Sequence, residues 1–286
     1  ITRMLDLQIV NGGQSTASLF HTRKRDRADL SQIFVQMKLS VIDSQQSETV
    51  VPRISEYANT QNRVNAADFF SNHPFHVRME GFSRRMWAPA QKGAQRETKW
   101  FYERTRGQYQ NEKAKLTPAE AKKFEAVYPR SQLITKTDAA KYSVSWGQEP
   151  HKVSAGAQKN FLAFANSVAD RWASSDAQFN EAYFKELVAK AILFQTIRAR
   201  VAKIDWYQSG YLANIVAYTM AKLAHSIASQ AKGARLDFAT IWNRQQPSEA
   251  LLDASLDVAH LCFRVLTAEQ RPIQNVTEWA KREQCW

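Results

Sequence analysis

Two adjacent glycines near the start of the chain stand where proteins often hold a phosphate. An alternating apolar run ends at Asn11, and Gly12 and Gly13 then lead into a helix start. Backbone N–H groups at such a turn point outward at the positive end of a helix dipole. Gln14 and the hydroxyl of Ser15 or its neighbour could add side-chain donors. The segment has neither the lysine of a Walker A loop nor the third glycine of a dinucleotide fingerprint. The alternative is a turn in which glycine serves backbone geometry alone.

A basic and aromatic segment at residues 99–109 is a second candidate. If it is a strand, Trp100, Tyr102, Arg104 and Arg106 share one face. Aromatic rings stack on bases, and arginines meet phosphates or stack beside them. The opposite face would pack against a core. The alternative is a half-buried strand whose rings pack and whose arginines point to solvent.

Three carboxamides, Asn59, Gln61 and Asn62, gather at the end of a predicted helix. Carboxamides can read a base or a ribose because they offer paired donors and acceptors. The same residues also cap helices and turn the chain. The local pattern favours the cap, and a ligand role stays open.

Lys136 stands at a helix entry that is rich in cations. From there it could reach a phosphate. The favoured alternative is a helix capped by Thr137 or Asp138, with the lysine side chain exposed.

One short motif is typical of an enzyme. Glu97 and Lys99 match the Glu-x-Lys end of a restriction-nuclease core, in which a carboxylate binds metal and a lysine helps position water. The acid expected before this pair is not evident, because Asp68 falls in a predicted helix. Mg²⁺ enters only with this nuclease alternative, and the catalytic residues are otherwise unknown. Whether the protein is an enzyme is left open.

His73 and His76 have a one-turn spacing that could hold a metal. Pro74 between them disturbs the helix, and no cysteine or clear carboxylate lies beside them. We therefore expect surface or capping histidines and no metal site.

The predicted elements of the first half are mixed. Strands are expected at residues 4–10, 33–42 and 99–106, and helices at 14–20, 50–61 and 66–86. Pro74 should kink or split the last of these helices. Thr117, Pro118 and Glu120 form an N-cap, a first-turn proline and a capping box, so a further helix should run to about Tyr128.

The second half is helical throughout. Helices are expected at residues 138–146, 154–172, 180–201, 210–230, 248–266 and 276–284. The predicted fold class is therefore α+β: a small mixed-sheet α/β part over residues 1–134, followed by an all-helical part over 135–286. No Pro/Gly/Ser-rich linker separates the parts, so one core could serve both.

The charge of the chain favours a polyanionic ligand, and its cysteine count favours a reducing compartment. The net charge is +12, and nine Lys or Arg residues against three acids lie between Arg84 and Lys115. Two cysteines are too few for a disulfide framework, which fits a cytoplasmic protein. No apolar run approaches the ~20 residues of a membrane span, so no membrane partner is expected.

Taken in order, these segments resemble the consensus blocks of the AIPR family, the bacterial abortive-infection phage-resistance proteins. The matching blocks are Ile9–Thr16, Asn59–Asn62 followed by Asp68 and Ser71, Lys99–Tyr109, and Thr135–Asp138 followed by Lys141 and Tyr142. The resemblance implies anti-phage defence in a bacterial cytoplasm, without a settled chemistry. Ser15 stands where the family pattern has threonine, and the hydroxyl is kept. Members usually extend well before the Asn-Gly block. The chain opens on Ile1 within a strand-like pattern, so we expect a fragment that lacks the family's N-terminal region.

The sequence and the resemblance together favour a defence protein that binds nucleic acid or a nucleotide. Its surface would join the glycine turn, the carboxamides and the segment at 99–109. Two alternatives remain, a metal-dependent nuclease using Glu97 and Lys99, and a sensor or scaffold that binds a phage or host protein. Oligomerisation is left open.

Overall fold

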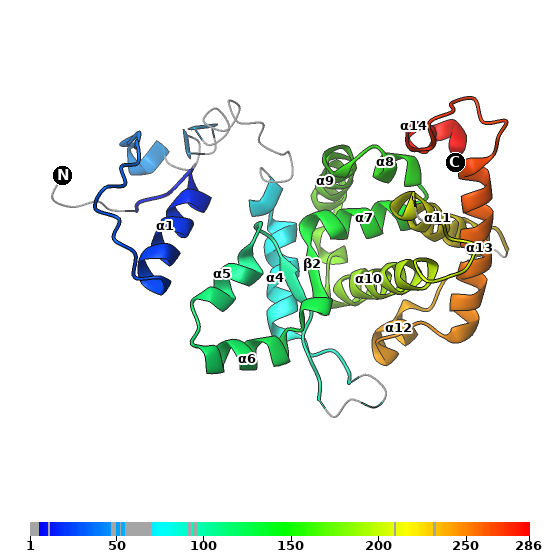
Figure 1. The fold of residues 1–286 in the computed structure, drawn as a ribbon, viewed down its shortest axis with the longest axis horizontal. Coiled ribbons are helices and arrows are strands. Elements are labelled where there is room, and N and C mark those ends of the chain that lie inside the picture. Colours follow the sequence, from blue (N-terminus) through cyan, green and yellow to red (C-terminus); the bar gives the residue numbers. More distant parts are fainter. Residues whose placement is uncertain are drawn as a thin grey trace. The chain divides into compact units, whose positions relative to one another are not determined.

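The computed structural model describes residues 6–10, 12–46, 50–51, 53–54, 70–90, 93, 96–208, 210–230 and 233–286 (Figure 1). The chain forms two compact units, residues 1–65 and residues 66–286. Each unit is described by itself.

Unit 1 contains helix α1, Gly13–Arg25, and a short 3₁₀ helix η1, Ser44–Gln46. Gly12 is the N-cap of α1 at φ 81°, a left-handed conformation that glycine adopts at little cost. The backbone N–H and the hydroxyl of Thr16 both donate to the Gly12 carbonyl, at 3.0 and 3.1 Å. The predicted helix start after the glycine pair is therefore confirmed.

The strands predicted in unit 1 are wrong for the residues that the structure describes. Residues 6–10 form no strand, and neither do residues 33–42. The second segment has the alternation of a strand but no described partner, and its side chains are solvated, with Phe34 88% exposed. Alternation alone does not make a strand, because the backbone groups need a neighbour to pair with. The helix expected at 50–61 lies mostly outside the described residues.

Unit 2 opens with a small α/β region. Its elements are η2 Phe70–Asn72, α4 Pro74–Arg85, β1 Phe101–Glu103, α5 Gln108–Ala114, α6 Pro118–Val127, η3 Arg130–Gln132 and β2 Leu133–Thr135. The predicted capping box of α6 is confirmed, since Thr117 and Glu120 bond each other's backbone N–H groups. Pro74 begins α4, which agrees with the break predicted at this proline, because proline suits the first helical position. Residues 66–69 of the helix predicted at 66–86 lie outside the described residues.

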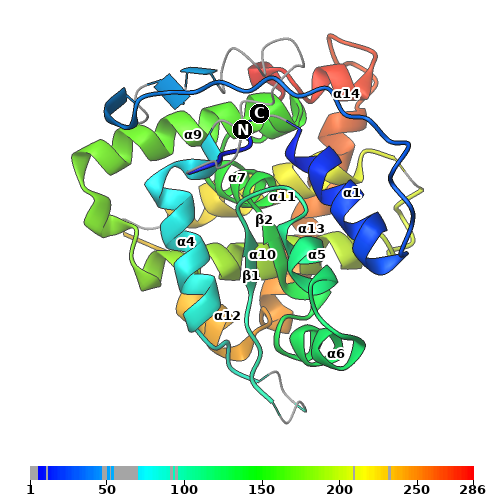
Figure 2. The same cartoon turned by 90° about the vertical axis from the view of Figure 1, so that its left-hand side faces the viewer.

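The sheet is smaller than expected and is parallel. Tyr102 of β1 pairs with Ile134 of β2, and α5 and α6 form the crossover that a parallel pair requires. Figure 2 shows the two strands side by side, with α4 next to β1. Within the described residues, the predicted mixed sheet is a two-stranded parallel sheet. Of the strand predicted at 99–106, three residues pair.

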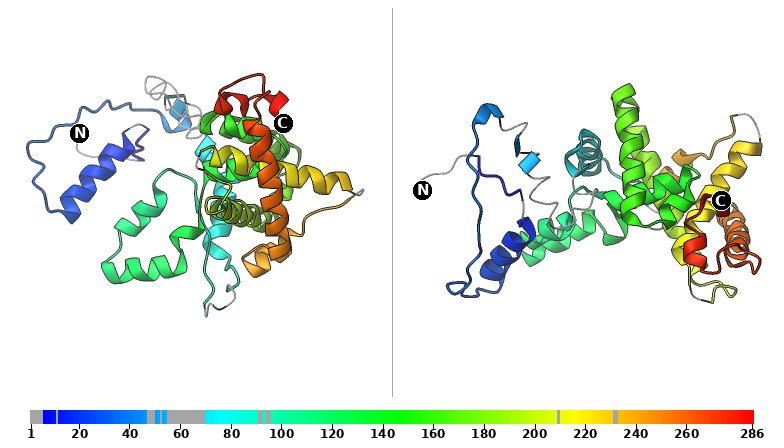
Figure 3. Two further views of the ribbon diagram at one scale, coloured as in Figure 1. Left: turned by 45° about the vertical axis from the view of Figure 1, so that its right-hand side comes forward. Right: turned by 90° about the horizontal axis from the view of Figure 1, so that it is seen from above.

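The rest of unit 2 is a helical bundle. Its elements are α7 Lys136–Trp146, α8 Pro150–Ser154, α9 Ala157–Ser174, η4 Asp176–Gln178, α10 Glu181–Val201, α11 Leu212–Gln230, α12 Phe238–Arg244, α13 Glu249–Thr267, α14 Val276–Trp279 and η5 Glu283–Cys285. Helices α7, α10 and α11 pack on one another, and α13 packs on α11 (Figures 1 and 3).

Most helices predicted in this half are confirmed, with differences at their ends. Asn180 and Ser248 are the N-caps of α10 and α13. The helix predicted at 154–172 is α9, which begins three residues later at Ala157, because Gly156 at φ 107° lies outside helical geometry. The helix predicted at 276–284 is shorter, with four residues in α14.

The core of unit 2 crosses the domain boundary predicted at residue 134. It extends from Phe75 in α4 to Cys285 near the end of the chain. The predicted boundary falls inside β2, between Ile134 and Thr135. Taken together, the described chain is mostly helical with one small sheet. None of the helices in the described part combines the length and apolar character needed to cross a bilayer.

Candidate functional site

The carboxyl ends of β1 and β2 bring three of the predicted site residues into one region. Tyr102 lies in β1, Arg104 directly follows it, and Lys136 is the first residue of α7 after β2. In sheets of parallel strands, ligands commonly bind beyond the strand carboxyl ends. The interactions of each side chain decide whether this edge is open to a ligand.

Arg104 is held by groups of the protein. Its Nε donates to Glu80 at 2.9 Å, and its Nη1 donates to the Ser71 carbonyl at 3.1 Å and to Asn72 Oδ1 at 2.7 Å. Burial alone would raise the pKa of Glu80, but hydrogen bonds from Gln108 and Arg104 outweigh it and lower that pKa. Arg104 therefore joins η2 and α4 to the end of β1, and its charge is already matched.

Tyr102 lies in the core, 1% exposed, and its hydroxyl is 2.7 Å from Nδ1 of His76. Burial lowers the pKa of His76 to about 3, and the charges of Lys136, His73 and Arg104 act in the same direction. The histidine is thus neutral at physiological pH and serves as a core hydrogen-bonding partner. The pKa of Tyr102 is raised, mainly by burial.

The stacking surface predicted for Trp100 and Tyr102 is not at the surface. Trp100 is 4% exposed, and its indole N–H donates to Gln245 Oε1 at 2.8 Å. Phe101 on the opposite face is also buried, against the rings of Tyr109 and of Phe124 in α6. The strand is covered on both faces, so alternation could not assign one face to solvent.

Lys136 is 5% exposed, contrary to the exposed lysine of the favoured sequence interpretation. The cap of α7 also differs, because Thr135 takes the role expected of Thr137 or Asp138. Its hydroxyl accepts from the Asp138 N–H at 3.1 Å and donates to the Asp138 carboxylate at 2.6 Å. A capping box thus fixes α7 at the end of β2.

His73 caps α4, with Nδ1 accepting from the Phe75 N–H at 3.2 Å. This confirms the capping role that the sequence favoured for His73. The surface or capping role expected of His76 is wrong, because that side chain is buried in the core against Tyr102. Within the described residues, no group of three or more His, Cys, Asp or Glu side chains is placed to hold a metal ion.

Arg106 differs from Arg104 because its side chain is exposed and has no ion pair among the described residues. Other cations of the segment 96–130 share this state. They are Arg96, Lys115, Lys122, Lys123 and Arg130. Several belong to the α5–α6 hairpin, which stands beside the helical bundle in Figure 3. We call these six residues the exposed cation set.

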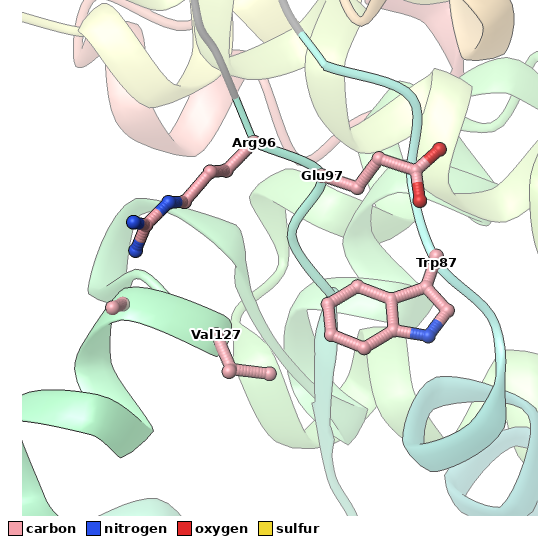
Figure 4. A pocket seen from close by; sticks show the side chains of 5 residues that line it. Trp87, Arg96, Glu97 and Val127 are labelled. Carbon is pink, nitrogen blue, oxygen red and sulfur yellow. The ribbon is translucent and has the colours of Figure 1, made fainter.

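A shallow pocket of about 310 Å³ lies near the same segment, lined by Trp87, Arg96, Glu97, Ala126 and Val127. Figure 4 shows Trp87 and Arg96 on opposite sides of it, with Val127 between them. Trp87 is 47% exposed. The sequence interpretation missed this residue, although a tryptophan between a helix and a strand, beside a basic run, was an available signal.

Of the two nuclease candidates, Glu97 is exposed at this pocket, whereas Lys99 is half-buried and contacts other residues of the protein. The Lys99 ammonium donates to the Arg84 carbonyl at 2.7 Å and lies 4.4 Å from the centre of the Trp87 ring. The lysine is therefore held next to an aromatic ring by a backbone carbonyl.

A family model described as AIPR protein matches residues 1–270 of the 286-residue chain. The chain belongs to the AIPR family. Membership confirms the resemblance found in the sequence blocks and implies a role in abortive infection or phage resistance. No curated protein matches the chain. No solved structure matches it either.

Not all predicted site residues of this AIPR protein are described. Asn11, Asn59, Gln61 and Asn62 lie outside the described residues. Gly12, Gly13 and Ser15 are placed at the start of α1, as is the backbone of Gln14. The composite surface that was to join these residues to the segment at 99–109 stays a prediction.

Proposed function

We propose that this AIPR protein binds nucleic acid or a nucleotide through the exposed cation set, as part of its role in phage defence. The proposal keeps the ligand class expected from the sequence and changes the residues that contact it. Arg104, Trp100 and Tyr102 hold the fold together, while Arg106 and its exposed neighbours face the ligand. The glycine turn at the start of α1 remains a proposed source of backbone donors to phosphate.

The observation that carries the proposal is uncompensated charge on the segment 96–130. The segment has nine cations and five acids. Four of the acids are occupied within the protein: Glu103 accepts from the Gly107 and Tyr109 N–H groups, Glu112 pairs with Arg84, Glu120 caps α6, and Glu125 pairs with Lys113. The exposed cation set has no such partners among the described residues. Free cations on one segment favour phosphate because binding releases condensed counterions.

A salt titration with matched variants tests the proposal. Lys122→Ala combined with Lys123→Ala removes two members of the set on α6. Lys203→Ala combined with Arg264→Ala removes two exposed cations elsewhere in unit 2 and is the control. The first pair should weaken binding of an oligonucleotide and flatten the plot of log affinity against log salt by roughly 0.7–0.9 for each lost contact. The control should leave the slope unchanged, and equal effects of the two pairs would overturn the assignment.

The alternatives give different results in the same preparation. A nuclease would show Mg²⁺-dependent cleavage that is lost in Lys99→Ala. A sensor or scaffold would show neither cleavage nor salt-sensitive binding, and would co-purify with a phage or host protein.

A further inference from the structure

We infer that the pocket beside Trp87 holds one unstacked base of a single-stranded nucleic acid. The inference rests on the proposed function for the attraction of the phosphate backbone. It adds the part of the ligand that is recognised, and it distinguishes single strands from duplexes.

Trp87 is the ring available for stacking. All eight tryptophans lie in the described part of the chain, and Trp87 alone is exposed. It follows the end of α4, whose C-cap is Met86. An exposed aromatic ring on a basic segment matches the usual platform for single strands, in which rings stack on bases and cations follow the backbone.

The pocket is held in place by backbone hydrogen bonds. The N–H of Ala88 donates to the Thr98 carbonyl at 2.7 Å, which ties the Trp87 loop to the segment leading into β1. The N–H of Lys99 donates to the Val127 carbonyl at 2.7 Å, which ties that segment to the end of α6. The Lys99 ammonium lies over the Trp87 ring and restricts its position. A platform ordered before binding loses little conformational entropy when the ligand arrives.

The size and lining of the pocket suit a base. Its volume of about 310 Å³ is at the small end of the range for ligand sites, roughly 300–1,000 Å³. Ala126 and Val127 supply apolar wall, and Trp87 supplies a stacking face. The Glu97 carboxylate repels phosphate, so the backbone should pass on the side of Arg96, which Figure 4 shows across the pocket from Trp87.

A duplex cannot use such a site without losing a base pair. Its bases are stacked and paired, and extruding one costs a few kcal/mol. The exposed cation set attracts duplex and single strand alike, because phosphate contacts carry no base information. Preference for single strands should therefore depend on Trp87, and salt sensitivity on the cations.

The test measures affinity for a mixed-sequence single strand and for its duplex, using the whole chain and its Trp87→Ala and Trp87→Phe variants. Trp87→Ala should weaken single-strand binding roughly 5- to 150-fold, as loss of one stacked base implies, with the salt slope and duplex affinity unchanged. Trp87→Phe should keep most of the affinity. Quenching of tryptophan fluorescence by the bound single strand should shrink in Trp87→Phe, which separates a stacking role from a folding defect.

Two outcomes would overturn the inference. If Trp87→Ala binds single strand as the unaltered protein does, while Lys122→Ala with Lys123→Ala still flattens the salt slope, the base pocket is refuted and the proposed function stands. If neither duplex nor single strand binds the unaltered protein, both proposals fail.

Discussion

His76 and Tyr102 form a buried pair whose chemistry predicts how stability depends on pH. The pKa of His76 is about 3 in the folded protein, against 6.5 as the ordinary value. Below pH 6.5 the His76 side chain therefore binds a proton in the unfolded chain, whereas in the folded protein it stays neutral until the pH approaches 3. Stability should be fully present above about pH 6.5 and fall as the pH drops toward 3, by up to about 1.4 kcal/mol per pH unit.

A double variant isolates this effect. His76→Phe with Tyr102→Phe replaces both partners by apolar rings, so neither leaves an unsatisfied polar group. Urea unfolding at pH 7.5, 6.5 and 5.5 should show that the free energy of unfolding falls less with decreasing pH in the double variant than in the unaltered protein. His225→Gln, at an exposed histidine, should leave the pH dependence as it was. An identical pH profile in the double variant would refute the role of His76.

Arg104 and Arg106 are two residues apart and should behave differently. Arg104→Ala should lower the free energy of unfolding by about 2 kcal/mol or more, because Glu80 loses a charged partner in a part-buried site. Arg106→Ala should change stability by less than about 0.5 kcal/mol and weaken oligonucleotide binding instead. Thermal unfolding and binding of both variants decide this, and a binding loss confined to Arg104→Ala at unchanged stability would contradict it.

Spacing along the sequence identified the residues of this region better than it identified their roles. Tyr102 and Arg104 lie toward the carboxyl end of β1, near the start of α7 at Lys136, whereas Trp100 precedes the strand and donates to Gln245. Their burial depends on helices that cover both faces of the strand, which local spacing does not reveal. The exposure of Trp87 likewise depends on what packs beside it.

At the scale of elements, substitutions at the start of α7 distinguish the observed N-cap, Thr135, from the N-cap expected from sequence, Thr137 or Asp138. Thr135→Ala should destabilise unit 2 by about 1 kcal/mol, since its hydroxyl satisfies the Asp138 N–H. Thr135→Ser keeps the hydroxyl and should retain most of the free energy of unfolding. Thr137→Ala should lower the free energy of unfolding by less than Thr135→Ala does. Chemical denaturation of the three variants is the measurement, and a larger loss in Thr137→Ala would favour the cap expected from sequence.

Helices were more predictable than strands, for a physical reason. A helix satisfies its backbone locally, so capping residues such as Thr117, Asn180 and Ser248 mark its ends in the sequence. A strand needs a distant partner, and residues 33–42 have the alternation without one in the described chain. The pairing of β1 with β2 depends on a crossover through α5 and α6, which no local pattern specifies.

At the scale of the whole molecule, the α/β region and the helical bundle of unit 2 share one core, and this predicts which part of the chain folds alone. Residues 66–286 contain the whole core of unit 2, so a chain starting at Ala66 should be helical and unfold in one cooperative transition. A chain of residues 135–286 loses Phe75, Trp100 and Tyr102 from that core and should fail to unfold cooperatively. Circular dichroism with urea unfolding tests both. Cooperative unfolding of residues 135–286 would support the boundary predicted from sequence.

The central claim is that the exposed cation set gives this AIPR protein affinity for nucleic acid, and a salt titration of oligonucleotide binding tests it most directly. Three or more phosphate contacts predict at least a roughly tenfold loss of affinity between about 50 and 200 mM salt, with a shallower slope in Lys122→Ala combined with Lys123→Ala. Affinity that does not change with salt, or a slope that these substitutions leave intact, would contradict the claim.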